Sequence, residues 1–445
     1  MKAITQPPPT THIGPITLRS PQELKAWPNN PRKHPPRQIA QLRAAIQSFG
    51  FTAPILLNEA GVVLSGHGRL QAALELKLEE VPTRTVSGWS LAQQRAFVLS
   101  DNKIGMLSSW DEELLLEEME LLIKDDFELE LTAFSTAEID LMFEPVTAKG
   151  KPDQDALQEV DASADLVTRL GDLWVLGNHK LLCGNSLQRE SFEALLADEC
   201  IQMAISDVPF NVAIKDVVGK GTVKHAEFQM ASGEMSPQEF TKFLQDHLEL
   251  VHAFAQDGAL VYTFIDHKGI RPVLDAALPY FGNHKQLIVW DKGVGGLGSH
   301  YRSQHELIFL HKKGTAPHIN TFELGQHGRY RTNVWAYAGS QQYTDKAILA
   351  EHPTPKPVPL IADAIRDSSH RKGIVFDAFA GSGTIFIAAE RTGRYARAIE
   401  LEPRYCDTSV RRWQRVTSKS AILEATGQTW EQVRAERLLT SQKEM

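Results

Sequence analysis

The chain has 445 residues, enough for two or three domains, and its 42% hydrophobic and 23% charged residues are typical of a globular protein. Apolar runs such as residues 259–265 are too short to span a bilayer, and the Pro-rich N-terminus lacks the apolar core of a signal peptide. Three scattered cysteines, Cys183, Cys200 and Cys406, argue against a disulfide framework and against a zinc site, so we expect a cytoplasmic protein with no metal and no membrane contact.

The net charge of −8 is unevenly distributed along the chain. Residues 111–144 hold 13 acidic side chains and one lysine, a local charge of −12, which leaves +4 for the rest of the chain. The total charge therefore does not exclude a nucleic-acid partner. Because Leu115, Met119 and Leu122 recur at helical spacing, we interpret the acidic segment as the solvated face of a helix.

The first elements predict a small α+β domain. A helix that ends at Gly50 is followed by two short strands, at residues 54–57 and 61–64. The stretch Ser65-Gly-His-Gly-Arg69 then opens another helix. Glycines at the N-terminus of a helix expose backbone N–H groups that can hold an anion, and a tight turn without any ligand is an equally good interpretation.

Residues 30–82, with Ser-Gly-His-Gly-Arg-Leu-Gln-Ala-Ala at their centre, resemble the N-terminal domain of ParB partition proteins, which has the ParB/sulfiredoxin fold. The resemblance implies that the loop formed by Gly66, His67, Gly68 and Arg69 contacts the phosphates of a nucleotide. In partition proteins this loop is more basic and contains a glutamate, so the resemblance does not extend to nucleotide hydrolysis.

Capping-box patterns predict two further helices, one after Ser90 with Gln93 and one after Ser135 with Glu138. A stretch rich in Lys, Asp, Gly, Pro and Ala then shows no apolar periodicity, which is typical of a linker. The predicted order is a ParB/sulfiredoxin-like domain with a helical appendix at residues 15–144, a linker at 145–164, a second domain at 165–420 and a C-terminal helical tail at 421–445.

Strands and helices alternate in the second domain. Two apolar runs flank the hairpin turn Gly177-Asn178, and Ser236-Pro-x-Glu239 caps a helix. Further strands are expected at residues 201–207, 259–265, 286–290 and 306–310. The alternation predicts an α/β fold with a mostly parallel, doubly wound, Rossmann-like sheet.

One of these strands ends in Asp207-Val208-Pro209-Phe210. Asp207 offers acceptor oxygens, and Pro209 keeps Val208 extended, so that the Val208 carbonyl has a fixed direction. A carboxylate and a carbonyl could accept both N–H groups of an exocyclic amine while the Phe210 ring stacks on the base. An ordinary strand-to-loop turn with a buried aromatic ring is the alternative.

The last βαβ unit begins with an apolar strand that leads into a Gly-rich turn and the start of a helix. Its candidate residues, in chain order, are Asp377, Phe379, Gly381, Ser382, Gly383 and Thr384. Glu400 ends the next strand, 23 residues after Asp377, close to the spacing at which an acid reaches the ribose of a bound nucleoside. The turn lacks the third glycine of a dinucleotide site, so S-adenosylmethionine fits better than NAD. A turn without a ligand is the alternative.

The order of these motifs resembles an amino-methyltransferase of the β arrangement, in which the target-base motif precedes the cofactor motif. Asp207-Val-Pro-Phe210, His352-Pro-Thr-Pro-Lys-Pro357, Asp377 to Thr384 and Glu400-Leu-Glu-Pro-Arg-Tyr405 carry the resemblance. With the ParB-like domain in front, the chain resembles the phage and prophage DNA methylases that fuse the two modules. Double-stranded DNA is then the expected partner, and the resemblance leaves a homodimer open.

The resemblance also implies roles for single residues. Asp207 and the Val208 carbonyl hold the amine, and Phe210 stacks on the flipped base. The remaining expected contacts are with the cofactor: Asp377, Phe379, Gly381, Ser382, Gly383, Thr384 and Glu400 around it, Thr354 and Lys356 near its carboxylate, and Asn185 at a further contact. The family usually has a proline where Val208 stands and an acid where Asn185 stands. Adenine N6 and cytosine N4 both stay open as targets, and the leading aspartate favours adenine by analogy.

Target recognition is expected between Lys215 and His352, where cations, amides and aromatic residues alternate with glycines. Such side chains can read base edges or hold phosphates, although any single one of them is more simply a surface charge. The candidates for DNA binding are Arg302, Ser303, Gln304, His305, Arg329, Arg331 and Asn333. Two other functions are considered: a ParB-like binding protein with a weakened methylase half, and an NAD-dependent enzyme.

Overall fold

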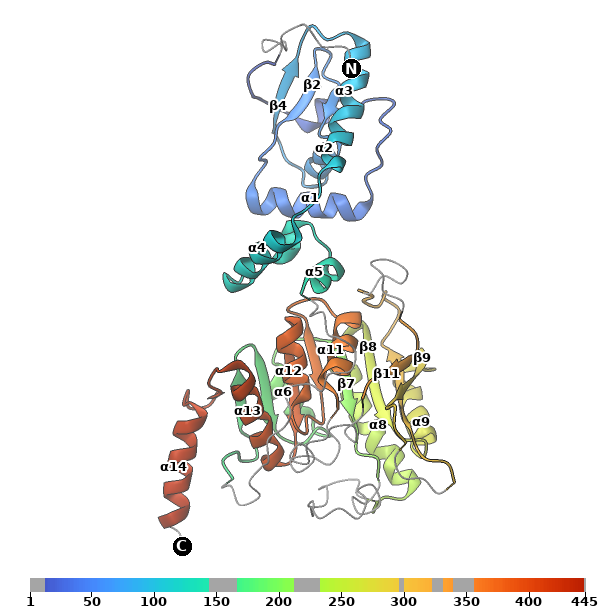
Figure 1. The fold of residues 1–445 in the computed structure, drawn as a ribbon, viewed down its shortest axis with the longest axis vertical. Helices are drawn as coiled ribbons and strands as arrows, with labels where there is room; N and C mark the ends of the chain where they lie inside the picture. Colours follow the sequence, from blue (N-terminus) through green and yellow to red (C-terminus); the bar gives the residue numbers. More distant parts are fainter. Residues whose placement is uncertain are drawn as a thin grey trace. The chain divides into compact units, whose positions relative to one another are not determined.

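The computed structural model describes residues 13–143, 166–211, 233–295, 300–321, 331–338 and 356–443, and it divides into two units, Met1–Ser135 and Thr136–Met445 (Figure 1). The predicted linker at 145–164 lies outside the described residues. Within the described ranges, no helix has both the length and the apolar character needed to cross a membrane.

The first unit has a four-stranded sheet with the order β1-β4-β2-β3, in which only β2 and β4 are parallel. Its core is formed by Ile55, Leu57, Val63, Leu70 and Val81. The strands are β1 (Thr17–Arg19), β2 (Ile55–Asn58), β3 (Val63–Ser65) and β4 (Val81–Val86), and the longer helices are α1 (Pro36–Phe49), α2 (His67–Glu75), α3 (Leu91–Ile104) and α4 (Glu112–Lys124). The expected α+β domain is confirmed, and β1 and β4 are added to it.

The second unit has a ten-stranded sheet with the order β11-β9-β10-β8-β7-β12-β13-β6-β5-β14. Its strands are β5 (Leu173–Leu176), β6 (His179–Cys183), β7 (Ile201–Asp207), β8 (Ala255–Ile265), β9 (Gln286–Asp291), β10 (His305–Lys312), β11 (Val334–Ala336), β12 (Ile374–Asp377), β13 (Tyr395–Glu400) and β14 (Ile422–Leu423). Its helices are α5 (Thr136–Met142), α6 (Arg189–Leu196), α8 (Pro237–Phe254), α9 (Ile270–Phe281), α11 (Val358–Ser368), α12 (Thr384–Thr392), α13 (Pro403–Thr417) and α14 (Trp430–Lys443).

Strands β8, β7, β12, β13 and β6 run parallel, which confirms the doubly wound sheet expected from the sequence. Strand β10 is the exception on one side, because it pairs antiparallel with both β8 and β9. Apolar residues of α11, α12 and α13 pack into one core cluster and those of α6, α8 and α9 into another. Both faces of the sheet are therefore covered, as parallel sheets require.

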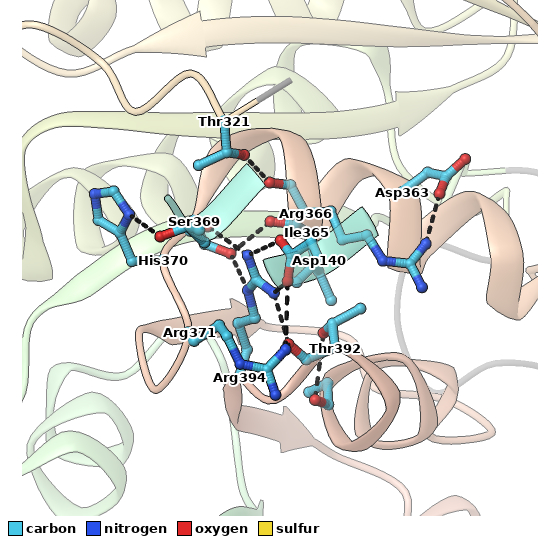
Figure 2. Close-up of polar contacts among 12 residues, drawn as sticks. Asp140, Thr321, Asp363, Ile365, Arg366, Ser369, His370, Arg371, Thr392 and Arg394 are labelled. Atoms are coloured by element: carbon cyan, nitrogen blue, oxygen red, sulfur yellow. Dashed lines mark hydrogen bonds and ion pairs between the residues drawn. The ribbon is translucent and has the colours of Figure 1, made fainter. Parts of the chain in front are cut away.

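Helix α5 belongs to the second unit, although the sequence suggested an appendix to the first domain. Asp140 of α5 accepts two hydrogen bonds from the Arg394 guanidinium, both of 2.8 Å, and both side chains are buried (Figure 2). Arg394 also donates to the carbonyls of Ser369 and Thr392, at 2.7 and 2.6 Å. These partners lie just before β12 and β13, so α5 is fixed at the amino ends of the parallel strands.

The predicted tail packs on the far edge of the same sheet. Strand β14 pairs with β5, and the Trp430 ring lies 5.0 Å from that of Trp174. Arg437 of α14 donates to the Asp172 carboxylate. The tail is therefore an integral part of the second unit.

Candidate active site

The candidate site lies at the carboxyl ends of β7, β12 and β13. These strands are adjacent and parallel, with Met203 opposite Val375 and Phe376 opposite Arg397. From β7 the chain continues to β8 on one side, and from β12 it continues to β13 on the other. Such a reversal of strand order opens the crevice in which doubly wound sheets bind ligands. The segments near Asp207 and Gly381, distant in the sequence, therefore meet at one edge.

Asp207 ends β7 and has one engaged and one free carboxylate oxygen. The Lys356 ammonium lies 2.6 Å from Oδ2, whereas Oδ1 is buried without a hydrogen-bond partner in the described part of the chain. Burial raises the pKa of the Asp207 carboxyl, and the Lys356 charge opposes that shift. A buried acceptor without a donor is costly, so Oδ1 is suited to receive an N–H group from a ligand.

The three residues that follow Asp207 lie at the same candidate site. Val208 is buried, and Pro209 and Phe210 are half-buried. The Lys356 ammonium lies 5.6 Å from the centre of the Phe210 ring. Carboxylate, rigid backbone and aromatic face therefore lie next to one another, and the base-binding role expected for them stays a prediction.

Four charged side chains of alternating sign, Asp207, Lys356, Glu306 and Lys292, form what we call the Lys356 cluster. Lys356 lies 3.2 Å from a Glu306 oxygen, and Lys292 lies 2.5 Å from the other. Burial would raise the pKa of Glu306, but the two lysines outweigh it, so this pKa lies below its ordinary value. Burial would lower the pKa of Lys356, yet Asp207 and Glu306 raise it. Lys356 is thus charged inside the unit.

The Gly-rich turn connects β12 to α12. Gly381 and Gly383 have φ values of 51° and 74°, which favour glycine. A Cβ on Gly383 would lie 2.6 Å from the Ser409 hydroxyl, so only glycine fits there. The Gly381 N–H donates to Glu400 Oε2 over 2.8 Å, and the Glu402 N–H donates to Oε1 over 2.8 Å. Glu400 therefore orients the turn.

Ser382 of this turn and Thr384, the first residue of α12, are both buried. Arg412 donates to the Ser382 carbonyl at 3.1 Å and to the Thr384 hydroxyl at 3.0 Å. The Thr384 hydroxyl in turn donates to the Lys356 carbonyl at 3.3 Å. The turn is thus tied to the residue that binds Asp207.

Two carboxyl groups beside the turn, at the ends of β12 and β13, have pKa values raised toward neutral pH. Burial raises the pKa of Asp377 to about 7, with smaller contributions from Asp207 and Glu400, and it raises the pKa of Glu400 to about 7. Because Asp207 and Glu400 both repel the Asp377 carboxylate, this edge suits a cationic ligand with amino and hydroxyl donors. S-adenosylmethionine, a sulfonium with an ammonium group and a ribose, meets that requirement.

Three further residues were expected at the cofactor. Phe379 packs on α8, with ring centres 6.0 Å from Phe243 and 5.0 Å from His247. Asn185 follows β6 beside Glu400, and its side chain accepts from the Leu187 N–H at 2.9 Å. Thr354 lies outside the described residues.

The residues expected at DNA fall into two groups. Ser303 and His305 are exposed, Gln304 donates to Asp291 at 2.9 Å, and Arg302 donates to the Gly295 carbonyl. Arg331, in contrast, pairs with Asp363 at 2.8 Å and Asp367 at 3.0 Å, and Asn333 donates to the Leu287 carbonyl at 3.0 Å. Arg331 and Asn333 therefore stabilise the unit itself. Arg329 lies outside the described residues.

The ParB-like loop lies at the start of α2, where Gly66 has a φ of 101° and His67, Gly68 and Arg69 form the first turn. A Cβ on Gly68 would meet Leu42 at 2.9 Å. The loop lines a pocket within the first unit, together with Asn30, Arg32, His34, Gln38, Leu42, Asp101, Asn102 and Met106.

Sequence reasoning missed Glu306, Lys292 and Asn211. Asn211, with a φ of 54°, donates to the Met235 carbonyl at 2.7 Å and accepts from Gly233 and Met235. It thereby joins the end of β7 to the segment before α8. Its place directly after Phe210 was a usable signal.

Two protein-family models match parts of this chain. The family model of N6 and N4 enzymes described as DNA methylase matches residues 201–411, and the ParB-methyltransferase HTH domain matches residues 113–170.

The ParB-like nuclease domain-containing protein YnaK of Escherichia coli is 41% identical over 80 residues, which cover 18% of this chain and 92% of YnaK. Type II methyltransferase M.HpaI of Haemophilus parainfluenzae is 23% identical over 252 residues, 53% of this chain and 74% of that protein. The structure of PvuII DNA methyltransferase (cytosine-N4-specific) aligns with 54% of this chain and 91% of its own, at 18% identity and a TM-score of 0.41.

Proposed function

Because the chain belongs to the ParB-like family in its first domain and carries an S-adenosylmethionine-dependent DNA amino-methyltransferase in its second, we propose that it methylates N6 of adenine at a specific site in double-stranded DNA. The observation that carries the proposal is Asp207 Oδ1, a buried acceptor without a described partner at the edge where the Gly-rich turn lies. Methylation of cytosine N4 is the second candidate. The resemblance to phage and prophage DNA methylases rests on the order of the motifs alone, so a phage origin stays a prediction.

The chain's own residues account for recognition of the amine. Asp207 Oδ1 and the Val208 carbonyl accept its two N–H groups, and Phe210 stacks on the extruded base. Two accepted hydrogen bonds pull the nitrogen lone pair out of conjugation with the ring and make it nucleophilic. Positioning then supplies most of the catalysis, because no covalent enzyme intermediate is needed.

S-adenosylmethionine supplies, when bound, an electrophilic methyl group on a sulfonium. Asp377, Glu400 and the backbone of the Gly-rich turn would hold it. In the transfer, the methyl carbon would pass from sulfur to the amine nitrogen, the sulfur would leave with the bonding electron pair, and the nitrogen would lose one proton. Asp207 can accept that proton, because burial raises the pKa of its carboxyl.

The direct test is methyl transfer by the purified full-length chain. Unmethylated duplex DNA is incubated with cofactor labelled in the methyl group, and Asp207→Ala serves as the matched control. We expect label in DNA with the wild type and a loss of at least about a thousandfold with the variant. Failure of the wild type on every DNA tested would favour a ParB-like binding protein whose methylase half is inactive.

The pocket of the first unit suggests a second ligand. Arg32 and Arg69 line it beside the N-terminus of α2, and the Arg69 Nε has no hydrogen-bond partner among the described residues. We propose that this pocket binds a phosphate-bearing ligand. Calorimetric titration with nucleoside triphosphates should give heat with the wild type and about a tenth of the affinity with Arg69→Ala. Equal affinities would place the ligand elsewhere.

A further inference from the structure

Lys356 connects the two halves of the proposed active site. Its ammonium lies 2.6 Å from Asp207, the proposed amine acceptor. Its backbone carbonyl accepts the hydrogen bond of Thr384, the first residue of α12 after the Gly-rich turn. One residue thus contacts the base-binding motif with its side chain and the cofactor turn with its main chain.

The surroundings of Lys356 hold its side chain in one place. The ammonium lies over three aromatic rings, 5.6 Å from the centre of Phe210, 5.4 Å from Phe264 and 5.7 Å from Trp290. Glu306 lies 3.2 Å away as a second counter-charge, and only 9% of the residue is exposed. An ammonium with two carboxylates and three ring faces has little freedom to turn away.

We propose that Lys356 is a positioning residue: it holds Asp207 ionised with Oδ1 directed at the target amine, and it fixes the distance between that oxygen and the cofactor turn. The inference deepens the proposed function and rests on it. It differs from the role expected from the sequence, a contact with the carboxylate of the cofactor. Glu306 is then the counter-charge that keeps Lys356 in place.

Removal of Lys356 should shift the pH dependence of turnover in a definite direction. Without the ammonium, Asp207 lies buried beside Glu306, and both burial and like charge favour its protonated form. A protonated Asp207 loses acceptor capacity for the amine, so turnover requires a higher pH. Removal of Glu306 should have the opposite effect and lower the pKa of Asp207, because Glu306 is one of the groups that raise it.

The test uses the full-length protein and three variants, Lys356→Met, Glu306→Gln and Lys180→Met. The last is the matched control, because it makes the same exchange at a lysine outside the candidate site, where Lys180 pairs with Glu424 near the surface. We measure kcat against pH from 6 to 9.5, KM for DNA, and cofactor affinity by calorimetry.

For Lys356→Met we expect a kcat about a hundredfold lower at neutral pH, recovery as the pH rises, and cofactor affinity within about threefold of the wild type. For Glu306→Gln, which preserves the shape of the side chain, we expect the acid limb of kcat to move to lower pH. Lys180→Met should change kcat by less than about threefold, because it removes only an exposed ion pair. A matching loss of kcat and cofactor affinity in Lys356→Met, or acid limbs that stay in place, would overturn the proposal.

Thermal unfolding provides a readout that does not need activity. Lys356→Met should be less stable than the wild type by a margin that grows from pH 5 to pH 8, as the unpaired buried carboxyls ionise. A wild type without any methyl transfer but with this pattern would refute the proposed function and leave the charge arrangement intact. A constant margin would refute the positioning role.

Discussion

Asp207, Asp377 and Glu400 place three carboxyl groups at the ends of neighbouring strands, and each is held differently. Lys356 holds Asp207, the Phe379 N–H donates to Asp377 at 3.0 Å, and two backbone N–H groups bind Glu400. Only the first has a cationic partner among these contacts. The other two carry pKa values raised to about 7, and a cationic ligand would favour their ionised forms.

Cofactor affinity should therefore depend on pH. The pKa of Glu400 in the folded protein is about 7, above its ordinary 4.5, so the carboxyl is half protonated at neutral pH. We expect affinity for S-adenosylmethionine to rise from pH 6 to pH 8 as Glu400 and Asp377 ionise, and Glu400→Gln to bind about tenfold more weakly with a flatter pH dependence. Calorimetric titration of both proteins across this range measures it, and an affinity that falls with rising pH would contradict the assignment.

The same raised pKa values have a consequence for stability without cofactor. A carboxyl whose pKa is higher in the folded chain than in the unfolded chain binds its proton more tightly when folded. The free energy of unfolding should therefore fall as the pH rises from about 4 to about 7, through the folded-state pKa values of Asp377 and Glu400. Asn185→Leu is an uncharged substitution that leaves both carboxyls in place, so its stability should show the same dependence on pH.

At the scale of elements, a buried ion pair ties α5 to the second unit. The acidic run around it was interpreted as a solvated face, yet Asp140 is only 2% exposed and binds Arg394, which is 1% exposed. Composition could not single out this one acid among 13, because its partner lies 254 residues further along the chain.

Removal of one member of this pair should destabilise the second unit strongly. Asp140→Ala leaves the Arg394 guanidinium buried without its carboxylate, at a cost of about 3–5 kcal/mol. Glu424→Ala, which breaks the exposed pair of Lys180 and Glu424, should cost about 0–1 kcal/mol. Urea unfolding followed by tryptophan fluorescence compares the two. Equal losses would show that the burial of the pair contributes nothing.

At the scale of the whole molecule, the sequence predicted two fold classes, their order and the strand ends at which the candidate site lies. Asp207 and Glu400 could be identified because each ends an apolar run, and the Gly-rich turn because its glycines stand between an apolar run and the start of a helix. Both glycines adopt positive φ values in the structure. Glu306 and Lys292 could not, since they reach the site through the antiparallel pairing of β9 with β10. That register depends on tertiary packing rather than on a local pattern.

The central claim is that the second unit methylates an exocyclic amine with Asp207 as the acceptor. The most direct measurement is nucleoside mass spectrometry of DNA from a methylase-deficient host that expresses the wild type or Asp207→Ala. We predict N6-methyladenine in DNA from the wild type and none from the variant. Unmodified DNA in both cases, or equal modification in both, would contradict the account.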